Sequence, residues 1–403
     1  WNVHEESFFP KLKPLSSLTF RVSYSLTGTP PDASYCNALT KLSMNTPYRP
    51  TTTDKELGFV VAALGNDELT YEKKHEFNFG VDAGFFNNRL NVTFDVYQRR
   101  NFDEIAPAVH QLYGKAYANV GSMKSWGEEL SISSTNVKTN DFSWQTSLIY
   151  SHNRTEITDL YNQGRVIDLV QGNGFAKQGY PARALFSIPF VGINEKGYPV
   201  CINEKGQATM GNLDFQERDN TDYLIYEGST DPIYNGSLGN TFNYKGFHLN
   251  LFLTYAFGNV VRLDPVFKAK YNDLTSMNHD FKNRWMQPGD ENVTNVPGVV
   301  SRYEYEQNRT LLSTAYNAYN YTSVRTAKGD FIRLKEISLA YDFPHRWFEK
   351  SPVNNISLKL QATNLMLLYA DKKLNGQDPE FMNAGGVASP MPKQFTLTLK
   401  LGL

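Results

Sequence analysis

The 403-residue sequence predicts an all-β protein, an antiparallel transmembrane β-barrel with long extracellular loops. Three observations support this prediction. Apolar and polar residues alternate with a period of two through most of the chain, and no long helix is expected. The alternating segments run for about 9–11 residues, which suits a tilted membrane crossing better than a soluble sheet. Very short connections alternate with very long ones.

Two neighbouring segments early in the chain show the alternation most clearly. Every second residue from Phe77 to Phe85 is apolar, and the residues between them are Asn, Gly or Asp. The pattern resumes at Leu90 and continues to Val96. Because the short polar turn at Asn87-Asn88 separates the two segments, we expect a β-hairpin.

The same reasoning places about ten strands along the chain. We expect them at 18–27, 76–86, 89–99, 127–135, 142–152, 234–243, 247–257, 331–342, 355–364 and 394–403. The short connections are 87–88, 136–141, 244–246 and 343–354, and the long ones are 28–75, 100–126, 153–233, 258–330 and 365–393. Short periplasmic turns and long extracellular loops produce this regular alternation of short and long connections. A soluble β-sandwich such as a lectin, which alternation alone leaves open, has no reason to keep it.

Aromatic residues are abundant and gather at the ends of the predicted strands. The chain holds 24 Tyr, 26 Phe and 5 Trp, which together make 14% of its residues. Those at strand ends include Tyr24, Tyr97, Tyr150, Tyr255–Phe257 and Tyr341–Phe343. Aromatic girdles at the two membrane interfaces would place them there.

Charge and cysteine content exclude several classes of protein. The formal net charge is −1, without the basic excess of a nucleic-acid-binding protein. No apolar run approaches the about 18 residues of a membrane-spanning helix. Cys36 and Cys201 are too few for a disulfide framework. Two free thiols are the expectation, and one bridge remains the alternative.

The sequence contains no motif that predicts catalysis or metal binding. None of the seven histidines has zinc-ligand spacing, and no nucleophile elbow or phosphate-binding loop is present. We therefore expect no catalytic residue, no cofactor and no metal. The carboxylates of Asp214, Glu217, Asp219 and Asp222 could bind Ca²⁺, but we interpret them as a solvated acidic loop.

One internal repeat is visible in the connection 153–233. The pentapeptide Ile193–Gly197 recurs as Ile202–Gly206, each reading Ile-Asn-Glu-Lys-Gly. Each copy ends in the residue that a tight turn with positive φ needs. We expect two small turns that project within the loop.

Several segments resemble the C-terminal part of SusC/RagA-type TonB-dependent outer-membrane receptors of Bacteroidetes. They run in family order along the chain and comprise Leu18–Gly28, Leu69–Arg100, Asn119–Leu130, Pro232–Gly258, Asp330–Tyr341, Ala362–Leu365 with Asp378–Glu380, and Ser389–Leu399. Two positions depart from the family pattern. Trp126 precedes Gly127 where Asn-Arg is common, and Leu403 stands where a terminal Phe is usual.

The resemblance implies an importer and not an enzyme. Such receptors have a 22-stranded barrel closed by an N-terminal plug, a TonB-type energy coupler and a SusD-like lipoprotein lid. We expect residues 1–403 to be the C-terminal portion of such a barrel, without the plug and the N-terminal strands. Ten strands alone would expose two unpaired sheet edges to outer-membrane lipid, so we expect the remaining N-terminal part as a partner.

The resemblance also gives the loop tyrosines a role. Aromatic side chains on loops above a rigid scaffold can stack on sugars or grip peptides. Contact with substrate or with the lid is therefore expected for Tyr223, Tyr226, Tyr303, Tyr305, Tyr316, Tyr319 and Tyr321. Packing of the loops against themselves is the alternative.

The leading functional hypothesis is active import of a bulky oligosaccharide or oligopeptide across the outer membrane. The first alternative is a passive porin or a surface-binding barrel without energy coupling. An outer-membrane hydrolase is a further alternative, but nothing in the sequence pairs with His110 or His279, two loop histidines.

Overall fold

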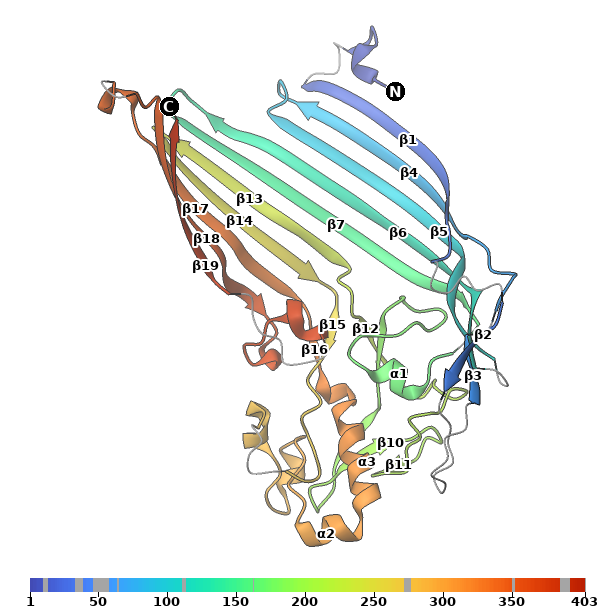
Figure 1. The fold of residues 1–403 in the computed structure, drawn as a ribbon. Coiled ribbons are helices and arrows are strands. Elements are labelled where there is room, and N and C mark those ends of the chain that lie inside the picture. The colour runs from blue at the N-terminus through green and yellow to red at the C-terminus, as the bar shows by residue number, and fades with distance from the viewer. Residues whose placement is uncertain are drawn as a thin grey trace.

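The computed structural model describes residues 1–9, 14–32, 39–45, 58–63, 65–110, 114–161, 163–271, 277–349, 352–384 and 392–402. Ten long strands in this part of the chain form one curved antiparallel sheet (Figure 1). In sheet order they are β1 (Leu15–Thr29), β4 (Glu72–Phe85), β5 (Leu90–His110), β6 (Gly114–Lys138), β7 (Phe142–Leu160), β13 (Tyr234–Tyr244), β14 (Phe247–Phe257), β17 (Phe331–Asp342), β18 (Asn355–Ala370) and β19 (Gln394–Gly402).

All ten predicted strands are present in the predicted order, and the antiparallel architecture is confirmed. The expectation of a long loop at 100–126 is wrong, because β5 and β6 continue through it and remain paired from Ile105 and Asn119 to His110 and Gly114. Asp103, with a φ of 57°, lies in an irregularity within this extension. Charged residues interrupt the alternation there, since a strand that rises into water needs no apolar face.

The apolar residues of the sheet lie on one face, which we call the apolar face. A single register row crosses nine of the ten strands on this face and contains no polar side chain. Its members, each paired with the next, are Leu18, Ala83, Val92, Ile132, Leu148, Leu238, Leu253, Leu334 and Met366. The period of two in the sequence is therefore the pleat of this sheet.

Two aromatic rows border the apolar face. The row near the short turns pairs Phe142 with Tyr244, then Phe247 and Tyr341. The row near the long connections contains Tyr150, Tyr255 and Tyr369. Phe247 and Tyr255 are eight residues apart, which is about 27 Å along the strand and about 20 Å along the normal at a tilt of about 40°. Tyr97 is not part of either row.

The opposite face of the sheet is polar. Arg21 Nε donates a hydrogen bond of 2.7 Å to Asp82, and its Nη2 donates one of 3.0 Å to Asp95. Thr93 also donates to Asp82 at 2.9 Å. Three adjacent strands are thus joined across the face that a barrel turns toward its lumen.

Tyr97 lies on this polar face and is buried over a glycine of the neighbouring strand. A Cβ atom placed on Gly127 would lie 2.3 Å from the carbonyl oxygen of His152 and 2.6 Å from the Tyr97 hydroxyl. Only glycine leaves room for this ring. The aromatic position that the sequence assigned to a girdle therefore serves packing between β5 and β6.

The long connections fold into a compact layer at one end of the sheet (Figure 1). We call the described residues of 163–233, 258–330 and 371–384 the loop layer. Its elements are α1 (Val166–Val170), α2 (Arg302–Gln307), α3 (Arg309–Asn320), β8 (Ala184–Ser187), β9 (Phe190–Ile193), β10 (Pro199–Ile202), β11 (Ala208–Thr209), β12 (Ile225–Ser229), β15 (Val260–Arg262) and β16 (Thr326–Lys328). Outside it, β2 (Lys41–Asn45) pairs with β3 (Gly58–Ala63).

Short 3₁₀ helices complete the secondary structure. They are η1 (Val3–Glu5), η3 (His279–Asn283), η4 (Asp290–Asn292), η5 (Ser323–Arg325), η6 (His345–Trp347), η7 (Lys372–Leu374) and η8 (Pro379–Ala384). No helix in the described residues is long and apolar enough to cross a membrane.

The 12-residue helix α3 is an element that the sequence analysis did not predict. Leu312, Ala315, Tyr316 and Tyr319 follow the helical spacing i, i+3, i+4, i+7, and all four are buried. The many tyrosines of this stretch favoured strand or loop instead.

The repeated pentapeptide forms two equivalent turns, as predicted. Asn194 Oδ1 accepts hydrogen bonds from the backbone N–H groups of Lys196 and Tyr198. Asn203, which follows the next strand, does the same with Lys205 and Gln207. The glycines that end the two copies have φ values of 81° and 73°.

We predict that Gly127→Ala destabilises the barrel, because the new methyl group must displace a backbone carbonyl and the Tyr97 ring at a cost of about 1–3 kcal/mol. The measurement is the urea midpoint of the folded, heat-modifiable band of the receptor in outer-membrane extracts.

Gly121→Ala, on the same strand, is the matched control. Its Cβ would lie 3.6 Å or more from any neighbouring atom, so its midpoint should match that of wild type. Equal midpoints for Gly127→Ala and wild type would contradict this packing.

Candidate functional site: the loop layer and its cavities

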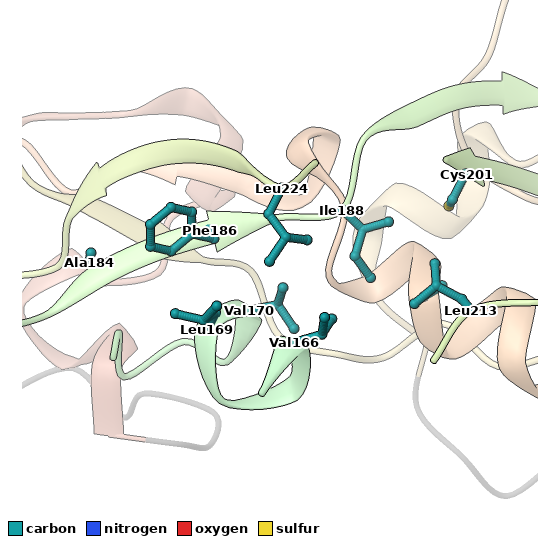
Figure 2. Packing of buried hydrophobic residues seen from close by; sticks show 10 residues of the cluster. Val166, Leu169, Val170, Ala184, Phe186, Ile188, Cys201, Leu213 and Leu224 are labelled. Carbon is teal, nitrogen blue, oxygen red and sulfur yellow. The ribbon is translucent and has the colours of Figure 1, made fainter. Parts of the chain in front are cut away.

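The loop layer has its own hydrophobic core, separate from the sheet. The largest cluster brings α1 against β8 and the segments that follow it (Figure 2). Its labelled members are Val166, Leu169, Val170, Ala184, Phe186, Ile188, Cys201, Leu213 and Leu224. The loops are therefore positioned by burial of apolar side chains, and they present a defined surface.

Cys201 belongs to this cluster and is a free thiol. Its side chain is buried, and burial raises the pKa of the thiol to about 12. The thiolate is the reactive form of cysteine, so Cys201 is inert while the core is closed. Cys36, the other cysteine, lies outside the described residues.

Arg262 on β15 ties three separate segments of the loop layer together. Its guanidinium donates hydrogen bonds to the carbonyl oxygens of Val170 at 3.2 Å, Thr322 at 2.7 Å and Phe186 at 2.6 Å. A further bond of 3.0 Å reaches the Ser187 hydroxyl. Burial lowers the pKa of Arg262, and these oxygen acceptors replace the water that the cation has lost.

A buried ion pair joins the loop layer to the sheet. Arg333 on β17 donates from Nη2 to both carboxylate oxygens of Asp378 at 2.6 Å, and both side chains are almost fully buried. Glu380 adds a contact of 3.2 Å. The segment 371–384 is held against the barrel wall by this pair, because separating it would leave a buried charge without a partner.

The loop tyrosines fall into two groups. Tyr316 and Tyr319 are 1% and 2% exposed and form part of the core, where burial raises the pKa of both hydroxyls. Tyr316 donates to the carbonyl oxygen of Gly298. Tyr223 and Tyr321 are partly buried against the first cluster. These four offer a ligand little or no surface in this arrangement.

The other three tyrosines reach the surface at two different places. Tyr303 on α2 is 76% exposed. Tyr305, also on α2, is half-buried, and the ammonium group of Lys270 lies 5.9 Å from its ring centroid. Tyr226 is 41% exposed but belongs to β12, far from α2 along the chain. Of these three, only Tyr303 and Tyr305 share an element, and as residues i and i+2 of a helix they do not face each other.

A cavity of about 860 Å³ lies beside α2. The side chains that line it include Glu195 and Lys196 of the first repeated turn, Glu291, and Glu304 of α2. Burial, followed by a hydrogen bond with Glu304, raises the pKa of Tyr198 at its edge. We call this the tip cavity. Its excess of carboxylates supplies acceptors for sugar hydroxyls or peptide N–H groups.

Sequence reasoning did not find the tip cavity. Its residues come from two connections that lie far apart along the chain, 153–233 and 258–330, and the repeat was interpreted as two turns only. The visible signal was the presence of Glu-Lys in the repeated pentapeptide, which places charged side chains at the tip of a turn.

A second cavity, of about 540 Å³, lies where β6 and β7 meet the loop layer. It is lined by Trp126, Arg154 and Glu156 of the two strands and by Tyr226 and Asp231 of the loops. We call this the wall cavity. Trp126 pairs with Arg154 and has the same parity as the apolar residues of β6, so the cavity adjoins the apolar face.

The acidic loop has an internal role in the structure. Glu217 Oε1 accepts hydrogen bonds from the backbone N–H groups of Arg218, Asp219 and Asn220, and these bonds, led by that of Asn220, lower the pKa of Glu217. Within the described residues, no group of three or more His, Cys, Asp or Glu side chains could hold a metal ion.

Known proteins resemble this chain in both sequence and structure. It is 25% identical over 397 residues to TonB-dependent receptor P3 of Formosa agariphila, a match that covers 94% of this chain and 37% of that protein. It is 24% identical over 430 residues to TonB-dependent receptor SusC of Bacteroides thetaiotaomicron, covering all of this chain and 39% of SusC. This chain resembles the SusC-type TonB-dependent receptors.

The fold agrees with that relationship. The structure of the RagAB peptide transporter matches with a TM-score of 0.76 and 24% identity, over all of this chain and 42% of that one. No protein-family profile matches the chain. The chain spans about two fifths of the length of these relatives, which are receptors and transporters and not enzymes. Like SusC and RagA, it is assigned to the outer membrane.

We predict that Arg262→Gln opens the core of the loop layer. Each carbonyl oxygen that loses its donor inside the core costs about 1–3 kcal/mol. Cys201, whose pKa is about 12 in the closed core, should then approach its ordinary pKa of about 8.5 and react with a maleimide at pH 8 more than about a hundredfold faster.

The measurement is the rate of Cys201 labelling in the intact receptor, followed by mass spectrometry. Arg183→Gln is the matched control, because Arg183 lies in the same layer but its side-chain contacts are exposed: an ion pair with Asp231 at 2.7 Å and a hydrogen bond of 3.0 Å from Nε to the carbonyl oxygen of Asn173. Labelling of Arg262→Gln at the wild-type rate would show that Arg262 does not hold the core.

Proposed function

We propose that this chain is the C-terminal portion of a TonB-dependent barrel that imports a bulky nutrient, an oligosaccharide or an oligopeptide, across the outer membrane. A plug and further strands would come from the remaining N-terminal part of the receptor. A TonB-type partner acting through that part would supply energy, and a SusD-like lipoprotein would cover the loops. The proposed import involves no covalent chemistry on this chain.

The observation that carries the proposal is the similarity to SusC and to RagA over the whole chain. The sheet supports it independently. β1 and β19 are the two edges of the sheet, and lipid cannot pair the free N–H and C=O groups of such edges. Additional strands would satisfy both edges by closing the barrel.

The tip cavity and the two tyrosines of α2, one exposed and one half-buried, support ligand or lid contact at the loop layer. In sequence, Tyr303 precedes and Tyr305 follows Glu304, which lines the cavity. Aromatic faces next to hydrogen-bond acceptors suit sugar rings and peptide backbones equally. The carboxylates disfavour a strongly anionic nutrient, since like charges would meet in the cavity.

We predict that Tyr303→Ala combined with Tyr305→Ala raises the KM of nutrient uptake about tenfold, because two aromatic contacts of about 0.5–1.5 kcal/mol each are lost. Uptake of fluorescent oligosaccharide and oligopeptide mixtures is measured in cells that carry the variant receptor. Tyr226→Ala, which changes the wall cavity, is the control and should leave KM unchanged.

The same assay tests energy coupling. A protonophore should abolish uptake if the barrel is TonB-dependent. Uptake that continues at the same rate would indicate a passive porin and contradict the proposal. The mixture that is taken up identifies the nutrient as a glycan or a peptide.

A further inference from the structure

We propose that the apolar face of the sheet binds the anionic headgroup of a glycolipid of the outer leaflet, through a patch on β4 to β7. The patch consists of His75, Arg100, Lys124, Trp126 and Arg154, and we call it the outer-wall patch. This inference goes beyond nutrient import and does not depend on the ligand of the loop layer.

Register places the patch on the same face as the apolar row. Arg100 pairs with His75 on one side and with Lys124 on the other. The pairing between β5 and β6 runs without irregularity from Leu90 to Asn101, so Arg100 shares the face of Val92. The same argument holds for Trp126 and Arg154, whose strands carry Ile132 and Leu148 on that face.

The height of the patch indicates the kind of lipid. On their own strands, Arg100 lies four residues beyond Val96 and Arg154 four residues beyond Tyr150. Four residues correspond to about 13 Å along a strand and about 10 Å along the membrane normal at a tilt of about 40°. A phospholipid headgroup layer is only about 5–8 Å thick, whereas a headgroup built from sugars reaches this height.

The charges of the patch favour an anionic occupant. Arg100 and Lys124 are directly opposite each other, an arrangement of like charges that destabilises a sheet unless an anion lies between them. Lys124 has one partner, Glu156, at 2.8 Å. Arg100 and Arg154 are exposed and form no ion pair with any residue that the structure describes. Phosphate or carboxylate groups would accept bidentate hydrogen bonds from these guanidinium groups.

Aromatic surface for the sugar lies beside the cations. The ammonium group of Lys124 is 5.6 Å from the Trp126 ring centroid. Trp126 also lines the wall cavity, together with Tyr226 on the loop side.

The strand lengths explain why the cavity is accessible from this side. β7 continues to Leu160, but β13 begins at Tyr234, which pairs with His152. Above that level β7 has the loop layer as its neighbour in place of β13 (Figure 1), with Ile157 donating to the carbonyl oxygen of Tyr180 at 2.9 Å. The cavity fills the gap that this change of neighbour leaves in the wall.

The test compares lipid retention in two variants of the whole receptor purified from its own outer membrane. One variant combines Arg100→Gln, Lys124→Gln and Arg154→Gln. The matched control is Arg99→Gln, because Arg99 is the adjacent residue of β5 on the polar face, paired with Glu76. The probe is glycolipid extracted from the same membrane and presented in phosphatidylcholine vesicles.

Each cation near an anionic surface contributes about 1 kcal/mol, or about fivefold in affinity, so the triple variant should bind these vesicles about a hundredfold more weakly. The control should bind as wild type does, and vesicles with an anionic phospholipid in place of glycolipid should bind weakly to all three. Equal binding by the triple variant and the control would overturn the proposal, as would competition by inorganic phosphate at low millimolar concentration. Nutrient uptake is not measured, so failure here is separate from failure of the import proposal.

Discussion

The pairing of backbone groups between strands is the constraint on which the rest of the structure depends. In hydrocarbon an unpaired N–H or C=O group costs several kcal/mol, so every strand between β1 and β19 must pair on both sides. Pairing fixes the register, and register fixes which side chains meet lipid. A slip of one residue would turn Val92 toward the lumen and its polar neighbours, Asn91 and Thr93, toward lipid. The row from Leu18 to Met366 exists because no strand slips.

Above the membrane a different interaction takes over. Water is again the solvent, so the connections bury their own apolar side chains in the clusters around Phe186 and Tyr316. Arg262 and the Arg333–Asp378 pair fix this layer internally and to the wall. The result is a rigid surface on a rigid scaffold, which is the arrangement that positions binding residues accurately.

The sequence was informative where one face of an element is apolar and the other polar. All ten strands met that condition and were predicted from alternation alone. The prediction failed for the extensions of β5 and β6, which lie above the membrane and in which apolar and polar residues no longer alternate. It also failed for α3, whose tyrosines have strand propensity. Tyr316 and Tyr303 have the same chemistry, and only tertiary packing buries one and exposes the other. Arg262 carries no local signal, because its partners lie 60 to 92 residues away.

The central claim is that the sheet crosses the outer membrane with its apolar face toward lipid. Single cysteines placed along β5 at Thr93, Phe94, Asp95 and Val96 of the intact receptor test it directly, by their reaction with a membrane-impermeant and a lipid-soluble thiol reagent in whole cells. We predict alternation: the lipid-soluble reagent labels positions 94 and 96 and does not label 93 and 95. Equal labelling of all four positions, or labelling of 94 and 96 by the impermeant reagent, would contradict the account.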